Sequence, residues 1–134
     1  MVVIFNSKSQ GVIVSEIKEL IVDAYGCRLD LNAPESIEKI AREALEAEGA
    51  TVVRSSHYRF QPHGLTLCLI LKESHFIIST WPEYKMAIVN IFLCNSSMSP
   101  MKVWTNFSRA IEPSEIKIHE VSHKVAELLK KKLA

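Results

Sequence analysis

Apolar residues along the chain follow two spacings, and these spacings predict where helices and strands lie. Residues three or four apart indicate one face of a helix, whereas short runs rich in β-branched residues indicate strands. The clearest helix is predicted over residues 35–48, because Pro34 suits a first turn and Gly49 can end it. Its apolar face would comprise Ile37, Ile40, Ala41, Ala44 and Leu45.

Four strand-like runs follow Gly49, with turn signals at residues 62–64 and at Pro82. They cover residues 50–60, 64–73, 74–80 and 86–94. Short strands that follow one another directly imply a mainly antiparallel sheet. The first 27 residues predict one or two more strands, whose boundaries the pattern leaves open.

The last third of the chain predicts a second helix over residues 99–111, with Ser99 as its N-cap and Pro100 in its first turn. A strand over 114–121 and a terminal helix over 122–133 would follow. Helices packed on one face of an antiparallel sheet give an α+β fold of the two-layer sandwich type.

Composition and charge narrow the class of partner. The chain has 134 residues and is 48% hydrophobic, which suits one domain over 1–134. Sixteen basic residues against 15 acidic ones leave a net charge of +1, so we expect neither a nucleic acid nor a membrane surface as partner. The partner expected is therefore a small molecule or another protein chain.

The three cysteines are odd in number, widely spaced and without a CxxC pair. This usage, with no signal-peptide pattern before it, is typical of the cytoplasm. The longest apolar runs, such as Leu65 to Leu71, are far below the roughly 20 residues of a membrane-spanning helix. The histidines show no ligand-like spacing, which makes a metal site an unfavoured interpretation.

The first candidate catalytic residues along the chain are Glu73, Ser74 and His75. Neighbours in a strand point to opposite faces, so adjacency alone does not make a hydrolase triad. No GxSxG elbow surrounds Ser74 either. Taken alone, the triplet is a polar start to a strand.

The wider arrangement resembles the prokaryotic S-adenosylmethionine decarboxylases. That family shows an aromatic followed by x-P-x-G, then E-S-H, then T-W-P-E, and a cysteine at the end of the next strand. The matching residues here are Phe60, Pro62, Gly64, Glu73, Ser74, His75, Thr80, Trp81, Pro82, Glu83 and Cys94. The spacing matches without a gap, and looser similarity covers most of the chain.

The resemblance implies that the protein cuts itself. Ser74 would attack the carbonyl of Glu73, and elimination would leave a pyruvoyl group derived from Ser74. The chain would then divide into a β chain, 1–73, and an α chain, 74–134. A pyruvoyl ketone supplies the electron sink that loss of carbon dioxide from an amino acid requires.

The same resemblance assigns the remaining site residues. Cys94 would return a proton to the substrate carbon after decarboxylation, a task for a thiol with a tunable pKa. Phe60 and Trp81 would stack on the adenine of S-adenosylmethionine, and Glu83 would accept hydrogen bonds from the ribose. Strand alternation turns His75 to the other face, which leaves it a supporting role.

Several residues depart from the family pattern at the processing site. Ser79 stands where active members carry the histidine held to be the base for elimination, and serine has no comparable basicity near neutral pH. If nothing replaces that imidazole, processing should be slow. Thr66 replaces a processing serine. Elsewhere, Lys85 and Met86 stand where the family usually has Gly-Tyr, Asn90 stands in place of an Asp, and Asn95 stands in place of a Gly. The histidine that the family carries near its N-terminus is absent here, because its position falls on Ile13 or Glu19.

Three interpretations follow. The first is a pyruvoyl-dependent S-adenosylmethionine decarboxylase that serves spermidine biosynthesis. The second is an unprocessed, non-catalytic paralog that binds a nucleoside-like ligand or an active subunit. The third keeps the lyase chemistry for another amine, such as arginine or ornithine. Family members dimerise around the sheet edges and build active sites near the subunit interface, so a homodimer is expected.

Overall fold

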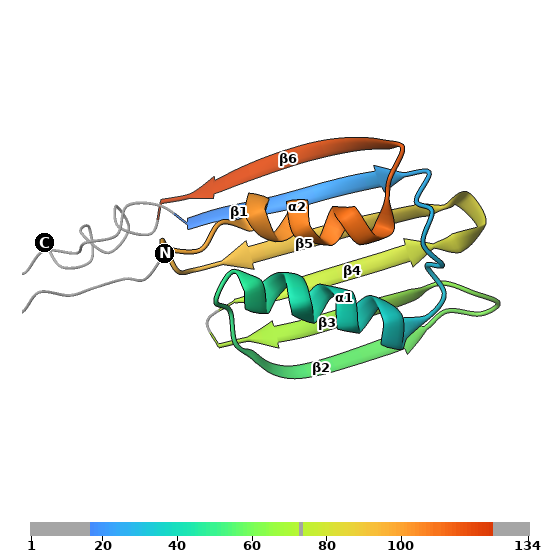
Figure 1. The fold of residues 1–134 in the computed structure, drawn as a ribbon, viewed down its shortest axis with the longest axis horizontal. Helices are drawn as coiled ribbons and strands as arrows, with labels where there is room; N and C mark the ends of the chain where they lie inside the picture. The colour runs from blue at the N-terminus through green and yellow to red at the C-terminus, as the bar shows by residue number, and fades with distance from the viewer. Residues whose placement is uncertain (1–16, 73, 125–134) are drawn as a thin grey trace, which may run out of the picture.

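The structure is a computed structural model that describes residues 17–72 and 74–124. Six strands form one sheet in the order β2-β3-β4-β5-β1-β6, and each adjacent pair is antiparallel. Two helices, α1 and α2, cover one face of this sheet (Figure 1). This arrangement confirms the predicted α+β sandwich.

The strands lie close to the predicted ranges. Residues 50–60 and 64–73 contain a strand each, and the turn signals at residues 62–64 and at Pro82 fall between strands as expected. The bounds are β1 Ile17–Tyr25, β2 Val52–Arg59, β3 Leu65–Leu71, β4 His75–Trp81, β5 Met86–Leu93 and β6 Glu115–His123. A short 3₁₀ turn, η1 Pro82–Tyr84, joins β4 to β5.

Both internal helices begin within one residue of the predicted position. Helix α1 spans Pro34–Ala47, one residue earlier at each end than the expected 35–48. Helix α2 spans Pro100–Ile111, and the Oγ of Ser99 accepts a hydrogen bond from the backbone N–H of Lys102. That bond satisfies one of the unpaired donors at the helix start. Within residues 17–72 and 74–124, no helix is long and apolar enough to span a bilayer.

The C-terminal part of the chain differs from the prediction, and the residues at both ends lie outside those that the structure describes. Ser122 and His123 belong to β6, where they pair with Lys18 and Ile17, so a terminal helix starting at Ser122 is wrong at its first two residues. The long antiparallel ladder with β1 supplies hydrogen bonds that an isolated helical turn would lack. Lys124 is not helical either, and residues 125–133 of that predicted helix lie outside the described residues, as do residues 1–16.

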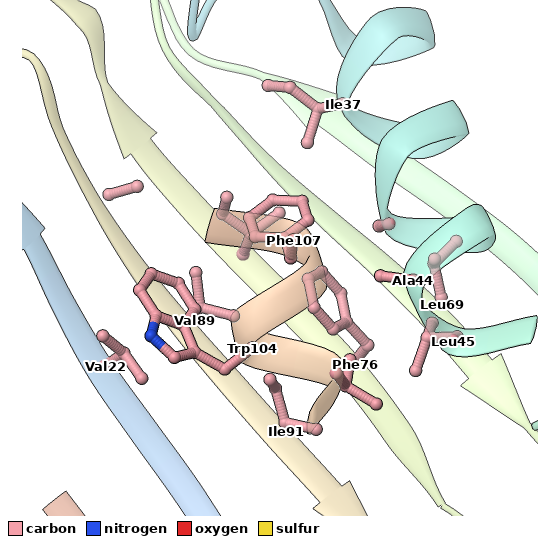
Figure 2. Packing of buried hydrophobic residues seen from close by; sticks show 14 of the residues in the cluster. Val22, Ile37, Ala44, Leu45, Leu69, Phe76, Val89, Ile91, Trp104 and Phe107 are labelled. Carbon is pink, nitrogen blue, oxygen red and sulfur yellow. The ribbon is translucent and has the colours of Figure 1, made fainter. Parts of the chain in front are cut away.

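The core fills the space between the sheet and the two helices (Figure 2). Phe76 from β4 meets Phe107 from α2 edge to face, with ring centroids 5.2 Å apart. Trp104 lies beside Phe107 and faces β1 and β5, while α1 contributes Ile37, Ala44 and Leu45. These contacts hold both helices on the same face, which leaves the opposite face of the sheet for other uses.

Phe107→Ala should lower the free energy of unfolding by about 3–5 kcal/mol, because it removes a fully buried ring and leaves a cavity against Phe76. Urea denaturation followed by circular dichroism measures the change. Lys102→Ala, at an exposed position of the same helix, is the control and should stay within about 0.5 kcal/mol. A loss below about 1 kcal/mol for Phe107→Ala would show that α2 is not packed as described.

The second face of the sheet carries no helix among residues 17–72 and 74–124 (Figure 1). We call it the open face. Its side chains are partly buried by one another and alternate with the fully buried side chains of the core face. On β4 and β5 the open face presents His75, Ile77, Ser79, Trp81, Met86, Ile88, Asn90 and Phe92.

Candidate active site

Ser74 lies in the tight turn between β3 and β4. The backbone N–H of Leu71 donates to the carbonyl oxygen of Ser74 at 3.0 Å, which ties the end of β3 to the start of β4. Ser74 itself is partly buried, and Glu73 lies outside the described residues. The predicted nucleophile therefore lies at one end of the sheet, between β3 and β4.

Cys94 lies at the same end of the sheet. His75 pairs with Phe92 of the neighbouring strand, so Ser74 and Cys94 lie just beyond one paired row. This is the end where β4 begins and β5 ends, at the left of Figure 1. Cys94 is partly buried and directly follows β5. A cavity of about 280 Å³ opens beside Ser74; it is lined by Gly49, Ala50, Thr51, Leu71, Lys72, Ser74, Asn95 and Met98. The structure thus brings the predicted nucleophile and proton donor to one end.

Phe60 follows β2, and Trp81–Glu83 lie where β4 passes into η1. The β2–β3 and β4–β5 connections that hold them lie at the opposite end of the sheet, on the right of Figure 1. The two turns touch at Gly64, where an added Cβ would lie 3.0 Å from the Phe60 ring and 3.4 Å from Pro82. The same Cβ would lie 2.7 Å from the carbonyl oxygen of Thr80, so only glycine fits this close approach. The predicted adenosyl-binding residues therefore form one cluster.

Three polar contacts hold this cluster in place. Nε2 of His63 lies 2.8 Å from Oε2 of Glu83 and links the two turns. The buried hydroxyl of Thr80 donates to the carbonyl of Leu31 at 2.8 Å and accepts from the backbone N–H of Leu65 at 3.1 Å. The sequence placed Thr80 in the T-W-P-E motif without a role. Its role is to satisfy buried backbone groups beneath the site.

The backbone at Lys85 shows why the resembled family usually has a glycine at this position. Its φ is 50°, in the left-handed region, at the end of the 3₁₀ turn η1. Glycine adopts this region without steric cost, whereas a residue with a Cβ does so less readily. The glycine usual in the family thus meets a backbone requirement that Lys85 meets with some strain.

The two ends are too far apart to serve one small ligand within a single chain. Strand β4 has seven residues between them, and at about 3.4 Å per residue its ends are about 20 Å apart. Ser74 precedes this strand and Trp81 ends it. An adenosyl amino acid attached at Ser74 cannot reach Trp81 of the same chain.

Thr66 and Ser79 lie between the two ends, on the open face. They pair across β3 and β4, and their hydroxyl oxygens are 2.7 Å apart. Ser79 is five residues from Ser74 along β4, so the structure does not bring the two serines of one chain together. Of the predicted processing residues, Ser74 therefore lies at one end of the sheet, whereas Thr66 and Ser79 lie within strands β3 and β4.

A polar row crosses the open face beside Ser74, and sequence reasoning did not assemble it. Nε2 of His75 lies 2.7 Å from Oδ1 of Asn90, and Nδ2 of Asn90 donates to Oε2 of Glu19 at 2.6 Å. Nε2 of His123 lies 2.9 Å from Oε1 of Glu19. The hydrogen bond from Asn90, then that from His123, lowers the pKa of Glu19 below its ordinary value. Its only sequence signal was that Asn90 and Glu19 fall where the family has other residues.

The other candidate groups are inert or unclustered. Cys27 is buried, and desolvation raises the pKa of its thiol, which opposes the reactive thiolate. Cys68 is partly buried in the middle of β3. Within residues 17–72 and 74–124, no three His, Cys, Asp or Glu side chains converge as metal ligands would.

Comparison with known proteins points to a single family. Residues 18–124 match the family described as S-adenosylmethionine decarboxylase. The S-adenosylmethionine decarboxylase proenzyme of Thermosipho melanesiensis is 36% identical over 107 residues, which cover 79% of this chain and 81% of the relative. That of Thermotoga maritima is 33% identical with the same coverage. That of Methanococcus maripaludis strain C5 is 30% identical over 83% of this chain and 92% of the relative.

A solved structure agrees with the sequence relatives. The crystal structure of the adenosylmethionine decarboxylase from Aquifex aeolicus superposes with a TM-score of 0.67 at 27% identity. The match covers 82% of this chain and 90% of that protein. The likeness therefore extends over most of the chain.

Proposed function

The chain belongs to the S-adenosylmethionine decarboxylase family, and from that premise we propose that it decarboxylates S-adenosylmethionine with a pyruvoyl group made from its own Ser74. The product would be the aminopropyl donor for spermidine, formed in the cytoplasm. The observation that carries this proposal is the position of Ser74, in a tight turn beside Cys94, in a chain whose relatives are named proenzymes.

The turn suits self-cleavage between residues 73 and 74. The cavity that Ser74 lines gives its side chain room to move. The N–H of Leu71 already holds the carbonyl of Ser74, and the same bond would hold that carbonyl once residue 74 is a pyruvoyl group. The residues present therefore fit a group derived from Ser74, which would supply an electron sink for decarboxylation.

The substrate would bind between two chains. Because the Phe60–Trp81–Glu83 cluster lies about 20 Å from the Ser74 end of β4, one chain cannot offer both to one ligand. A homodimer solves this if the cluster of one protomer meets Ser74 and Cys94 of its partner. Thr66 and Ser79 of the first protomer would then also approach the partner's site.

The open face is where we place the partner, in preference to a sheet edge. It holds the half-buried row on β4, from His75 through Ser79 to Trp81, and none of the helices among residues 17–72 and 74–124 covers it. Ile77, Ile88 and Phe92 make it substantially apolar. Two such sheets packed face to face, one turned end for end, bury both faces and close the site from water.

Trp81→Ala should weaken the binding of S-adenosylmethionine by about 1–3 kcal/mol, the scale of stacking between a base and an aromatic side chain. Isothermal titration calorimetry on the full chain measures the dissociation constant. Trp81→Phe is the matched control, because it keeps a ring that can stack and should lose less affinity. Binding needs no pyruvoyl group, so Ser74→Ala can carry both substitutions to prevent turnover.

The same titration separates the alternatives. If the unsubstituted chain binds neither S-adenosylmethionine nor methylthioadenosine at millimolar concentration, the adenosyl assignment fails. Release of carbon dioxide from arginine or ornithine would then support the decarboxylase of another amine. Binding without any release of carbon dioxide would instead support the non-catalytic paralog.

A further inference from the structure

The imidazole of His75 is held by one continuous row of side chains from four strands. His75 comes from β4, Asn90 from β5, Glu19 from β1 and His123 from β6. The ring of Phe92 stacks on His75 at 5.2 Å between centroids with an interplanar angle of 17°. Phe92 also meets His123 edge to face at 5.9 Å. His75 is therefore fixed in both position and ring plane.

The row also determines which nitrogen of His75 carries the proton. An ionised carboxylate only accepts hydrogen bonds, so Asn90 must present its Nδ2 to Glu19 and its Oδ1 to His75. Oδ1 is an acceptor, so Nε2 of His75 must donate. In the neutral ring Nδ1 then keeps the lone pair. The lowered pKa of Glu19 agrees with its ionised form at neutral pH.

We propose that His75 is the base that removes the Cα proton of residue 74 when the pyruvoyl group forms, and that Asn90 and Glu19 position it. This inference rests on the proposed self-cleavage and names the residue that replaces the missing imidazole at Ser79. Nε2 is engaged by Asn90 of β5, which leaves Nδ1 as the basic nitrogen. His75 directly follows Ser74 in the chain, so this base is carried by the residue next to the Cα that must lose its proton.

The step balances without an outside oxidant. The Ser74 oxygen attacks the carbonyl of residue 73, the peptide C–N bond breaks, and the hydroxyl proton passes to the released amine. His75 then takes the Cα proton, the electron pair forms a Cα=Cβ bond, and the ester oxygen leaves as the carboxylate of residue 73. The resulting enamine tautomerises to an imine, which water hydrolyses to the pyruvoyl ketone and ammonia.

Ser79 of the same chain does not compete for this role. It lies five residues along β4, and its hydroxyl is paired with Thr66 at 2.7 Å. A hydroxyl also has no basicity comparable with that of an imidazole near neutral pH. Within this chain, His75 is the imidazole nearest to Ser74 in sequence.

His75→Ala should slow pyruvoyl formation about 100-fold, the lower end of what a positioned general base contributes. Mass spectrometry over time measures the blocked 74–134 fragment. The ester forms before the base acts, so hydroxylamine should still cut the variant at residue 74 and leave a serine N-terminus. Added imidazole should recover part of the rate, which a purely structural role would not predict. His57→Ala, an exposed position on β2, should process at the unsubstituted rate.

Asn90→Leu tests the positioning residue independently of processing. In a Ser74→Ala background, which keeps the chain whole, ¹⁵N NMR should show neutral His75 protonated at Nε2. Asn90→Leu removes the acceptor, so the ring should become a mixture of tautomers. With Ser74 present, Asn90→Leu should also form pyruvoyl more slowly. A His75 ring protonated at Nδ1 before the substitution would overturn the assignment.

The failures of the two proposals look different. If the unsubstituted chain stays whole even with hydroxylamine, no ester forms, and the proposed self-cleavage falls together with its base. If it is processed and His75→Ala is processed equally fast, the function stands but His75 is not the base. Ser79→His that accelerates processing by about 10²-fold or more would also overturn the inference, because it would show that no base was in place.

Discussion

Ser74→Ala will leave the chain in one piece, with a single mass for residues 1–134, whereas the unsubstituted protein will yield fragments 1–73 and 74–134. Alanine has no hydroxyl to attack the carbonyl of residue 73, so neither ester nor pyruvoyl can form. The loss should therefore be complete for both cleavage and decarboxylation. Intact-mass spectrometry after prolonged incubation, with and without hydroxylamine, measures the first, and release of carbon dioxide from S-adenosylmethionine measures the second.

Ser56→Ala provides the matched control, because Ser56 is an exposed serine on β2 and takes no part in the site. It should be processed and turn over substrate at the unsubstituted rate. Circular dichroism should find the Ser74→Ala chain folded, since Ser74 lies in a turn outside the hydrophobic core. Fragment formation in Ser74→Ala would refute cleavage by this serine.

Cys94→Ala will separate processing from turnover. The chain should still be cut before residue 74, because the thiol is not needed to form the ester or to eliminate it. Release of carbon dioxide at saturating S-adenosylmethionine should fall about 10³-fold, within the range for loss of a positioned acid. The comparison measures kcat per pyruvoyl group, so incomplete processing does not distort it.

The control for this thiol is Cys27→Ala. Cys27 is a buried core residue with a raised pKa, and its removal should leave kcat per pyruvoyl group unchanged. Equal turnover for Cys94→Ala and the unsubstituted chain would assign protonation to another group. A Cys94→Ala chain that is not cut at all would place Cys94 in processing instead.

The local structure was largely readable from the sequence. Helix α1 was predicted from the spacing of Ile37, Ala41 and Ala44, because residues three and four apart lie on one face of a helix. The start of α2 followed from Ser99 and Pro100, since capping is a contact within four residues. The role proposed for Ser74 came from the resemblance to a known family, and the end of the chain was misread where β6 continues through His123.

What only the tertiary structure decided is which residues meet. The spacing of the motif does not show that Ser74 and Trp81 lie at opposite ends of β4, which makes a second chain necessary to the proposed site. Nor does local periodicity bring Glu19 to Asn90, 71 residues away, or to His123, 104 residues away. Those contacts depend on β1 lying between β5 and β6 in a fixed register. Strand order and register arise from burying one face of every strand at once, so a window of neighbouring residues does not contain them.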